Sequence, residues 1–506
     1  MAGQLFAAIN IGSFELELGI YDMTPKTGPV QIDRVAHHLG IGKESFRTGR
    51  ISGQLVNEIC KELNSFVRIM KEYQVKTCRA CTTSAIREAE NREIILDQIR
   101  VKTGIEVRVL SNSEERLLNY QAIALRGEAF RKVIQKGTAI ADVSYGSTQL
   151  STFDKEILVT TQKLRIGALR LAGMTASLPG TLPEKKQVIT ELVRDELASY
   201  QKIYLKDRDK NREIRHLIAI GEPVLYLARN DAAAGFQEKV TAEEFRLYCS
   251  RVTAMDLHEI EEEFGVNREY ASLLLPTAIA YQEILDMTGA ELIWIPGILL
   301  CDGIAAEYAI SQNKLPIDHN FEEDIISATR HMARRYRCSG PHTQLLEGYV
   351  QPLFDILKKH HGLSARDRLL LQIAVIIHGC GKFISTSNVG ECAYHIIMAT
   401  EIMGLSRQER QIVANMVRYH ETRFEYEQTD IRTAKLTAML CLLNALDRSH
   451  TQKLTDLKFA LKDNELVITT AYKGDISLEQ MAVREREEFF EEILGLKLKL
   501  QQKKRG

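Results

Sequence analysis

The sequence predicts a two-lobed α/β fold followed by an all-helical domain. Before about residue 315, short apolar runs with the period of strands alternate with longer amphipathic runs with the period of helices. The strand–turn–strand pattern that opens the chain starts again at Thr138, and from Phe321 the pattern is that of almost continuous helix. A chain of 506 residues is also too long for one compact core, which agrees with several domains.

The first lobe is predicted over residues 1–125. It opens with a hairpin, residues 5–10 and 15–23, whose turn contains Gly12, because glycine permits a tight reversal of the chain. The remaining elements alternate along the chain: a helix at 54–73, a strand at 75–82, a helix at 88–103, a strand at 106–110 and a helix at 114–125.

The second lobe is predicted over residues 126–315, and it begins in the same way as the first. The run TAIADVSYGSTQLSTF, residues 138–153, gives two alternating strands joined by a polar turn that contains a glycine. This restart indicates a duplicated fold whose two turns face one another across a cleft. The segment KLPIDHN has turn-forming residues at Pro316 and Asn320, which predicts a linker after this lobe.

An all-helical domain is predicted over residues 316–450. Its helical runs include LLEGYVQPLFDILKKHHGL, RDRLLLQIAVIIHGCG and RQERQIVANMVRYHE. The run LKFALKDNELVITTAY then predicts strands in a small C-terminal α+β segment, residues 451–506. The terminal KLKLQQKKRG is expected to be a frayed, charged end.

Charge and cysteine usage restrict the class of partner and the compartment. The 66 basic and 67 acidic residues leave a net charge of −1, which excludes a globally basic DNA-binding protein. The nine cysteines are scattered, and the start MAGQLFAAINIG lacks the features of a signal peptide, so we expect a reducing cytoplasm. Charged residues interrupt every long apolar run, and we therefore expect no membrane-spanning helix.

The turn of the second hairpin, DVSYGST at residues 142–148, has some of the residues of a phosphate-binding loop. Such a loop needs backbone NH groups that converge on the anion and a nearby carboxylate that can hold a metal. Asp142 and Gly146 suit this task, whereas Ser144 and Tyr145 add side chains where the backbone should approach the ligand. An ordinary hairpin turn is the alternative interpretation.

Motifs along the whole chain are similar to those of one known family. In the two lobes they are AAINIGSFELELGI, TTSAIREAEN, IEVRVLSNSEERLL, ADVSYGSTQL and IGALRL; in the helical part they are LFDILKKHHGL, LLLQIAVIIHGCGKFIS, GLSRQERQIVANMVRYH and NALDRSHTQKLTDL. The chain resembles the exopolyphosphatase and guanosine pentaphosphate phosphatase (Ppx/GppA) family in its long form. This resemblance implies two actin-like or sugar-kinase-like (ribonuclease H-like) lobes around a cleft, an HD-related helical domain and a homodimer.

The resemblance also implies an activity and the residues that carry it. The implied reaction is hydrolysis of the terminal phosphoanhydride of polyphosphate or pppGpp, with Mg²⁺, or alternatively Mn²⁺, and a water activated by a glutamate. Carried over by position, Glu115 is the catalytic base and Arg87 is a phosphate contact. The implied phosphate-binding residues are Gly12, Ser13, Asp142, Gly146, Ser147 and Thr148, and the implied metal-binding positions are Asp142, Gln149 and Asn10.

The same loops depart from the family pattern. The first turn reads NIGSFE, so that Asn10 replaces an aspartate, Phe14 replaces an asparagine and Glu15 places an anion beside the phosphate position. The second turn lacks two glycines of the family pattern, at Ser144 and Tyr145. Gln149 stands where a metal-facing glutamate is usual, and a third loop has Glu222 and Pro223 where backbone NH donors are expected. Because Mg²⁺ prefers anionic oxygen ligands, we expect a weakened metal site.

In the helical domain, the residues of an HD-type metal site are only partly present. His342, His378 and His420 remain. However, Gly379 follows His378 where an aspartate is usual, and Asn444 stands in place of another ligand aspartate. We therefore favour packed histidines over a bound metal.

Two other groups have a structural explanation that we favour. Cys78 and Cys81 lie on a predicted strand, where a spacing of three directs side chains to opposite faces, so that a shared zinc site is disfavoured. The basic run HMARRYRC, residues 331–338, with Arg330 before it, is interpreted as a solvated helix face. Guidance of a polyanion toward the cleft is the alternative for this run.

Two hypotheses about function follow from these residues. The first is a divergent phosphohydrolase that uses Glu115, Arg87 and Asp142 on polyphosphate or a guanosine polyphosphate. The second is a catalytically impaired sensor or scaffold, because Asn10 and Gln149 replace carboxylates.

Overall fold

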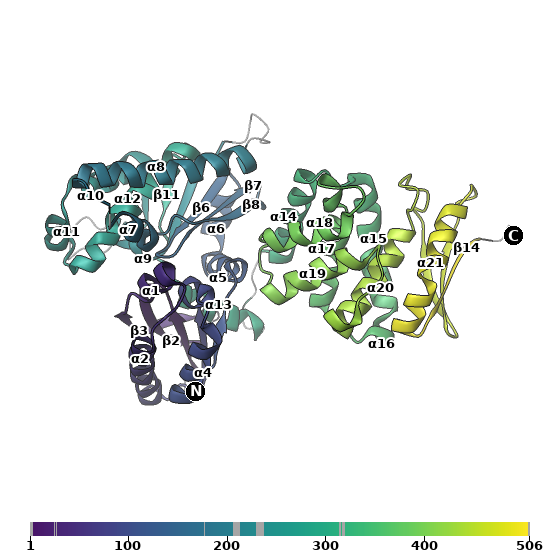
Figure 1. Cartoon of the computed structure of the whole chain (residues 1–506), viewed down its shortest axis with the longest axis horizontal. Helices are drawn as coiled ribbons and strands as arrows, with labels where there is room; N and C mark the ends of the chain where they lie inside the picture. The colour runs from purple at the N-terminus through teal and green to yellow at the C-terminus, as the bar shows by residue number, and fades with distance from the viewer. Residues whose placement is uncertain are drawn as a thin grey trace. The chain divides into compact units, whose positions relative to one another are not determined.

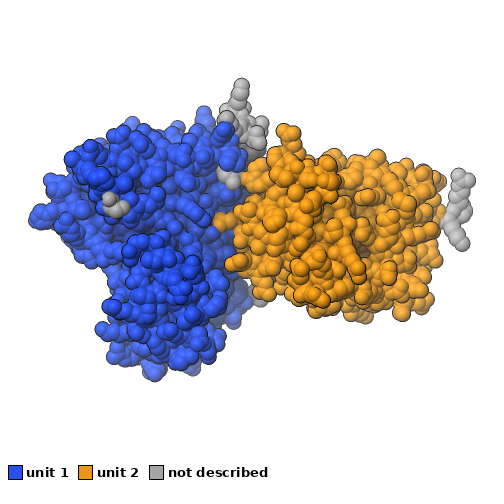
Figure 2. All heavy atoms as spheres, viewed as in Figure 1, with its two compact units in different colours: residues 1–320 blue, residues 321–506 orange. Residues whose placement is uncertain are grey.

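The computed structural model describes residues 4–503 apart from 25, 27, 177, 206–212, 229–236, 313–314 and 316–318. The chain forms two compact units, residues 1–320 and 321–506 (Figure 2). The division falls at the end of the predicted linker, of which Pro316 lies outside the described residues. Among the helices of this part of the chain, none combines the length and apolar character that a membrane span requires.

A five-stranded sheet forms the first lobe of unit 1 and has the order β3-β2-β1-β4-β5. Its strands are β1 (Leu5–Ile11), β2 (Glu15–Asp22), β3 (Val30–His38), β4 (Thr77–Thr82) and β5 (Val107–Val109). β1 pairs antiparallel with β2 and parallel with β4, with Ile11 opposite both Leu16 and Thr82. The β1–β2 turn and the end of β4 therefore lie at the same edge of the sheet.

Helices cover both faces of this sheet. One face carries α2 (Gly53–Glu72) and α4 (Arg92–Thr103), and the other carries α5 (Asn112–Ala124) and α13 (Leu300–Ser311). Because side chains alternate along a strand, Ile9 and Ile11 join the first core and Phe6 and Ala8 join the second. The chain thus returns to the first lobe through α13. The packing of this lobe therefore involves α13 in addition to the predicted residues 1–125.

The second sheet of unit 1 repeats the order of the first. Its strands are β6 (Thr138–Val143), β7 (Thr148–Asp154), β8 (Ile157–Leu164), β9 (His216–Ile220), β10 (Lys239–Thr241) and β11 (Leu292–Trp294). The order β8-β7-β6-β9-β11 corresponds to β3-β2-β1-β4-β5, with the same strand directions. Figure 1 labels β2 and β3 in one lobe and β6, β7, β8 and β11 in the other. The predicted duplication is confirmed, and the β6–β7 turn is the counterpart of the β1–β2 turn.

The remaining helices of unit 1 pack around these two sheets. They are α1 (Ile41–Thr48), α3 (Ser84–Glu88), α6 (Glu128–Ile134), α7 (Ala168–Ala176), α8 (Leu182–Tyr200), α9 (Glu222–Leu227), α10 (Ala242–Ala254), α11 (Leu257–Phe264) and α12 (Arg268–Thr288). Most residues of α12 are buried, and this helix contacts α7, α8, α9 and α10. α1 of the first lobe contacts α7 of the second, which brings the lobes together beside the two turns.

Unit 2 begins at Phe321 with a series of helices, as predicted. They are α14 (Phe321–Arg335), α15 (Gly340–Ile356), α16 (Lys358–His361), α17 (Ala365–Ile377), α18 (Val389–Ala399), α19 (Arg407–Tyr419) and α20 (Ile431–Ala445). The HD-related assignment of this part stays a prediction.

The C-terminal segment folds as β12 (Lys458–Lys462), β13 (Glu465–Thr470), α21 (Ser477–Leu494) and β14 (Lys497–Gln502). The prediction of a frayed end was wrong for residues 497–502, because β14 pairs parallel with β13. Its alternating KLKL pattern places Leu498 and Leu500 in the core, while the lysines remain exposed.

The two cysteines of the CxxC sequence lie on β4. Cys78 is exposed and Cys81 is buried, so their side chains occupy opposite faces of the strand. The predicted orientation of the two side chains toward opposite faces of the strand is confirmed.

Close packing of α13 on α5 gives a test of the first lobe. A Cβ atom added to Gly303 would lie 2.7 Å from the carbonyl carbon of Leu118, so we expect Gly303→Ala to destabilise unit 1 by about 1–3 kcal/mol. Gly173 in α7 has no atom within 4 Å of such a Cβ, and Gly173→Ala should stabilise by up to about 1 kcal/mol. Urea denaturation followed by circular dichroism measures both changes. Unchanged stability of Gly303→Ala would show that α13 does not pack in this way.

Candidate active site

The two duplicated turns meet at the centre of unit 1. Ser13 Oγ of the β1–β2 turn lies 2.8 Å from Ser84 Oγ at the start of α3. A Cβ atom on Gly146 of the β6–β7 turn would overlap Ser84 Oγ and would come to 3.0 Å from Ser13 Oγ. Only glycine therefore fits at residue 146, and the predicted residues Gly12, Ser13, Gly146 and Ser147 line one pocket.

The β6–β7 turn presents a row of backbone NH groups. Ser144 NH donates to the Ser147 carbonyl at 3.1 Å and closes the turn. The NH groups of Tyr145, Gly146 and Ser147 donate to no acceptor in the part of the chain that the structure describes. Successive NH groups of this kind form an anion-binding concavity. Thr148 does not line the pocket, because its hydroxyl donates to the Ile166 carbonyl at 2.8 Å.

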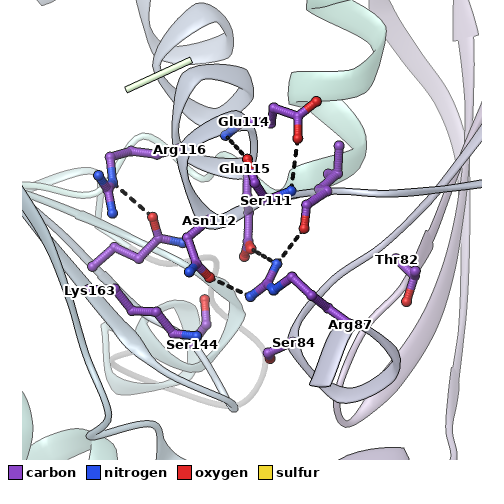
Figure 3. Close-up of polar contacts among 12 residues, drawn as sticks. Thr82, Ser84, Arg87, Ser111, Asn112, Glu114, Glu115, Arg116, Ser144 and Lys163 are labelled. Carbon is purple, nitrogen blue, oxygen red and sulfur yellow. Dashed lines mark hydrogen bonds and ion pairs between the residues drawn. The ribbon is translucent and has the colours of Figure 1, made fainter. Parts of the chain in front are cut away.

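Glu115 and Arg87 meet beside this turn (Figure 3). Arg87 Nη1 lies 3.4 Å from Glu115 Oε2 and donates to the Leu110 carbonyl at 2.6 Å, while Nη2 donates to Asn112 Oδ1. Glu115 lies in the first turn of α5, whose start is fixed by a capping box between Ser111 and Glu114. Both predicted side chains are thus held in place by the end of β5 and the start of α5.

Asp142, at the end of β6, lies in the same pocket as Glu115. Its Oδ2 accepts from Asn119 Nδ2 at 2.9 Å, and its Oδ1 accepts from the hydroxyl of Ser144. Burial, followed by the charge of Glu115, raises the pKa of Asp142 to about 7. Burial and the neighbouring carboxylate therefore both disfavour the ionised form of Asp142.

The two amide residues at metal positions have different surroundings. Arg116 Nε donates to Gln149 Oε1 at 2.9 Å, and Gln149 does not line the pocket. Asn10 does line it, and the Oδ1 atoms of Asn10 and Asn119 have no hydrogen-bond partner among the described residues. Asp142 with these two amide oxygens is an all-oxygen donor set, which suits Mg²⁺ or Mn²⁺, but it contains one carboxylate where the family pattern has more.

Basic side chains of the second lobe approach Glu88 at the end of α3. Lys163 Nζ lies 3.1 Å from Glu88 Oε1, and Arg170 pairs with Glu88 Oε2. Arg170 Nε also donates to the Gly146 carbonyl at 2.6 Å, which fixes the phosphate-type turn. Burial and the nearby charge of Arg87 lower the pKa of Lys163. Figure 3 shows both side chains in the same site.

The substituted residues of the three loops contact one another on the opposite wall. The rings of Phe14 and Tyr145 have centroids 4.9 Å apart. The Tyr145 hydroxyl donates to Glu222 Oε2 at 2.7 Å and lies 3.0 Å from the Tyr270 hydroxyl. The Tyr145 side chain is therefore held on this wall by its contacts with Phe14 and Glu222.

Arg34 of β3 gathers three carboxylates on this wall. Its guanidinium lies 3.0 Å from Glu17, 3.5 Å from Glu15 and 3.9 Å from Glu222. Burial raises the pKa of Glu15 and Glu17 to about 7 and that of Glu222 to about 8, and Arg34 opposes each shift. Glu222 is the first residue of α9, where Pro223 follows without a backbone NH.

The pocket between these walls is small. Its cavity volume is about 80 Å³, below the roughly 300–1,000 Å³ of most small-molecule sites. The pocket therefore has room for a terminal group of a ligand and not for a whole nucleotide.

Three residues that the structure brings to this site were not predicted from the sequence. Asn119 follows Glu115 by four residues on α5, and this helical spacing could have placed it on the same face. No local sequence pattern points to Arg34 or Lys163, since the residues that they contact lie far away in the sequence.

The histidines of the helical domain also come together. His342 Nε2 lies 3.2 Å from both His378 Nε2 and Asn444 Oδ1, and His342 Nδ1 lies 2.8 Å from Asp447 Oδ2. The rings of His378 and His420 have centroids 5.3 Å apart. All are buried, and the choice between packed histidines and a metal stays a prediction.

The basic run of the helical domain has acidic partners within unit 2. Arg330 contacts Glu323 at 3.0 Å and Glu347 at 2.6 Å. Arg334 and Arg337 are exposed. These surroundings agree with a solvated helix face.

Comparisons with known proteins identify the family to which the chain belongs. The Ppx/GppA phosphatase family matches residues 25–308, and domain III of the Ppx/GppA phosphatases matches residues 326–483. Exopolyphosphatase 1 of Mycobacterium tuberculosis (strain ATCC 25618 / H37Rv) is 24% identical over 310 residues, which are 58% of this chain and 86% of the relative. The guanosine-5'-triphosphate,3'-diphosphate pyrophosphatase of Photobacterium profundum is 19% identical over 480 residues, which are 92% and 91% of the two chains.

Solved structures share the fold of unit 1. An exopolyphosphatase from Cytophaga hutchinsonii matches with a TM-score of 0.53 at 17% identity and covers 61% of this chain and 98% of its own. The Aquifex aeolicus member of the Ppx/GppA family matches with a TM-score of 0.51 at 18% identity and covers 61% and 99%. The family match alone spans more than half of the residues. The chain therefore belongs to the Ppx/GppA phosphatase family.

Proposed function

We propose that this chain removes the terminal phosphate of polyphosphate or of a guanosine polyphosphate, using a water molecule that Glu115 deprotonates. The observation that carries the proposal is that Glu115, Asp142 and the turn residues Tyr145, Gly146 and Ser147, whose NH groups have no backbone acceptor among the described residues, line one pocket. In the proposal, Glu115 is the base and the turn is the anion cradle for the same phosphoryl group.

Binding of the terminal phosphoryl group relies on the β6–β7 turn. Its NH groups offer hydrogen bonds to phosphate oxygens, and the hydroxyls of Ser13 and Ser84 face the same point. Arg87 does not line the pocket itself, but its Nη1 contacts Glu115, which does. A phosphoryl oxygen would compete for this guanidinium and leave Glu115 free to accept a proton.

The proposed chemical step is an in-line displacement at phosphorus. The water oxygen forms a bond to the terminal phosphorus while the bond from that phosphorus to the bridging oxygen breaks. Glu115 takes the proton of the water, and the bridging oxygen leaves with the electron pair on the shortened chain. Orthophosphate and a chain with one phosphate fewer are the products, and Arg87 offsets charge on the phosphoryl oxygens.

A divalent cation is part of the proposal. Asp142, with the amide oxygens of Asn10 and Asn119, would hold Mg²⁺ or Mn²⁺. When bound, such an ion supplies charge neutralisation to the phosphate groups. One carboxylate in place of several predicts a weak site and slow turnover.

The substrate class rests on the relatives and on the size of the pocket. One relative is named an exopolyphosphatase and another a guanosine-5'-triphosphate,3'-diphosphate pyrophosphatase. A cavity of about 80 Å³ accepts one terminal phosphate group, with the rest of the chain outside. The homodimer implied by the family resemblance stays a prediction.

Substitution of the base tests the proposal. Glu115→Gln keeps the size of the side chain but cannot accept the proton, so we expect phosphate release from tripolyphosphate and pppGpp with Mg²⁺ to fall by about 10²–10⁴-fold. The matched control is Glu93→Gln on the exposed surface of α4, which should release phosphate like the wild type. If the wild type releases no more phosphate than Glu115→Gln, the catalytic proposal fails.

Restoring the metal positions is a second test. Asn10→Asp together with Gln149→Glu adds carboxylates where the family has them, and Arg116 can pair with the new glutamate. We expect kcat/KM to rise by at least about tenfold and the Mg²⁺ concentration for half-maximal activity to fall, because carboxylates bind this ion better than amides. Enzyme assays over a Mg²⁺ series measure both quantities. Unchanged kinetics in the doubly substituted protein would contradict this assignment of the metal position.

A sensor or scaffold is the second candidate function. It is favoured by the contacts of Tyr145 and Glu222, which fill one wall of the pocket with side chains and buried negative charge. Calorimetry separates the possibilities, since a sensor binds tripolyphosphate or pppGpp and leaves it intact. A scaffold shows no binding of either compound.

A further inference from the structure

Glu15, His38 and Glu222 bring three metal-ligating side chains to one point on the wall opposite Glu115. Their ligand atoms all lie within 4.8 Å of one another. Glu15 on β2 and His38 on β3 are directly paired across the two strands. Glu222 comes from the first turn of α9 in the second lobe. The cluster therefore joins both lobes and contains none of the residues assigned to the reaction.

The geometry of Glu15 and His38 fits two ligands of one ion. Glu15 Oε2 lies 3.4 Å from His38 Nε2. Two ligand atoms bonded at about 2.0–2.1 Å to a tetrahedral zinc ion are separated by about 3.4 Å. Glu15 Oε2 has no hydrogen-bond partner among the described residues, although only 5% of Glu15 is exposed. The carboxyls of Glu15 and Glu222 are close enough to share a proton through a hydrogen bond, and a metal ion bound between them would take the place of that proton.

The charge of the cluster favours a divalent cation. Three buried carboxylates, those of Glu15, Glu17 and Glu222, share the single guanidinium of Arg34, which leaves two negative charges in excess when all are ionised. Arg34 contacts the Oε1 atoms of Glu15 and Glu222, and its shortest contact is with Glu17. Glu15 Oε2 is therefore not in contact with Arg34 and lies beside His38. A cation bound at this oxygen would leave the contact between Arg34 and Glu17 intact.

We propose that Glu15, His38 and Glu222 bind one Zn²⁺ ion per chain, with solvent as the fourth ligand. The mixture of one imidazole and two carboxylates suits Zn²⁺, whereas Mg²⁺ avoids imidazole. Glu222 Oε2 also accepts from the Tyr145 hydroxyl, a contact that orients the carboxylate. Since the ligands come from both lobes, the ion links them beside the pocket. Binding of zinc does not require that the chain hydrolyse a phosphoanhydride, so the two proposals fail separately.

Zinc titration of the metal-free, full-length protein in competition with a chromophoric chelator tests the site. We expect one tight site in the wild type and at least tenfold weaker binding after His38→Ala or Glu15→Gln. The matched control is His37→Ala, because His37 lies next to His38 on β3 and contacts Glu62 instead, at 3.3 Å. This control should bind zinc like the wild type.

The buried histidines of the helical domain are a second group of side chains of a zinc-ligating type, and His342→Ala tests whether zinc binds there instead. Retention of the tight site in His342→Ala and its loss in His38→Ala support the proposal. Absence of a tight site in the wild type, or equal zinc affinity of the wild type and His38→Ala, overturns it. Cobalt substitution gives a second readout: the visible absorption of tetrahedral Co²⁺ should be present in the wild type and in His37→Ala and absent from Glu15→Gln, whose folding is checked by circular dichroism.

Discussion

The ion pairs of Arg34 join the two lobes of unit 1 through buried carboxylates. One guanidinium faces Glu15 and Glu17 of the first lobe and Glu222 of the second, and all three carboxylates are buried. Removing one partner of a buried pair leaves an uncompensated charge, which typically costs about 3–5 kcal/mol. On the other side of the pocket, Lys163 of the second lobe contacts Glu88 of the first, which is a further ion pair between the lobes.

Four of the departures from the family pattern form one connected cluster, whereas Asn10 and Gln149 lie outside it. Phe14 and Glu15 come from the first turn, Tyr145 from the second and Glu222 from the third, yet their side chains contact each other or share Arg34. Glu115 lies outside this cluster and is held by Arg87. The four clustered substitutions therefore contact one another beside the pocket, while Glu115 keeps its own partner and Asn10 replaces a carboxylate in the pocket lining.

Local patterns in the sequence predict much of the fold, and long-range packing accounts for what they miss. Period and turn residues predict both hairpins and the duplication, because each follows from neighbouring residues. The return of α13 to the first lobe and the pairing of β14 depend on partners far away in the chain. The same holds for the site: the resemblance places Glu115 and Asp142 in one pocket, but nothing local connects Arg34 with Glu222.

The central claim, that Glu115 directs water at a terminal phosphate, is tested most directly by hydrolysis in ¹⁸O-labelled water. Tripolyphosphate and the wild-type protein are incubated with Mg²⁺, and the products are analysed by mass spectrometry. If the claim is correct, one ¹⁸O atom enters the released orthophosphate and none enters the pyrophosphate. Label in the pyrophosphate, or orthophosphate release no faster than in Glu115→Gln, would contradict it.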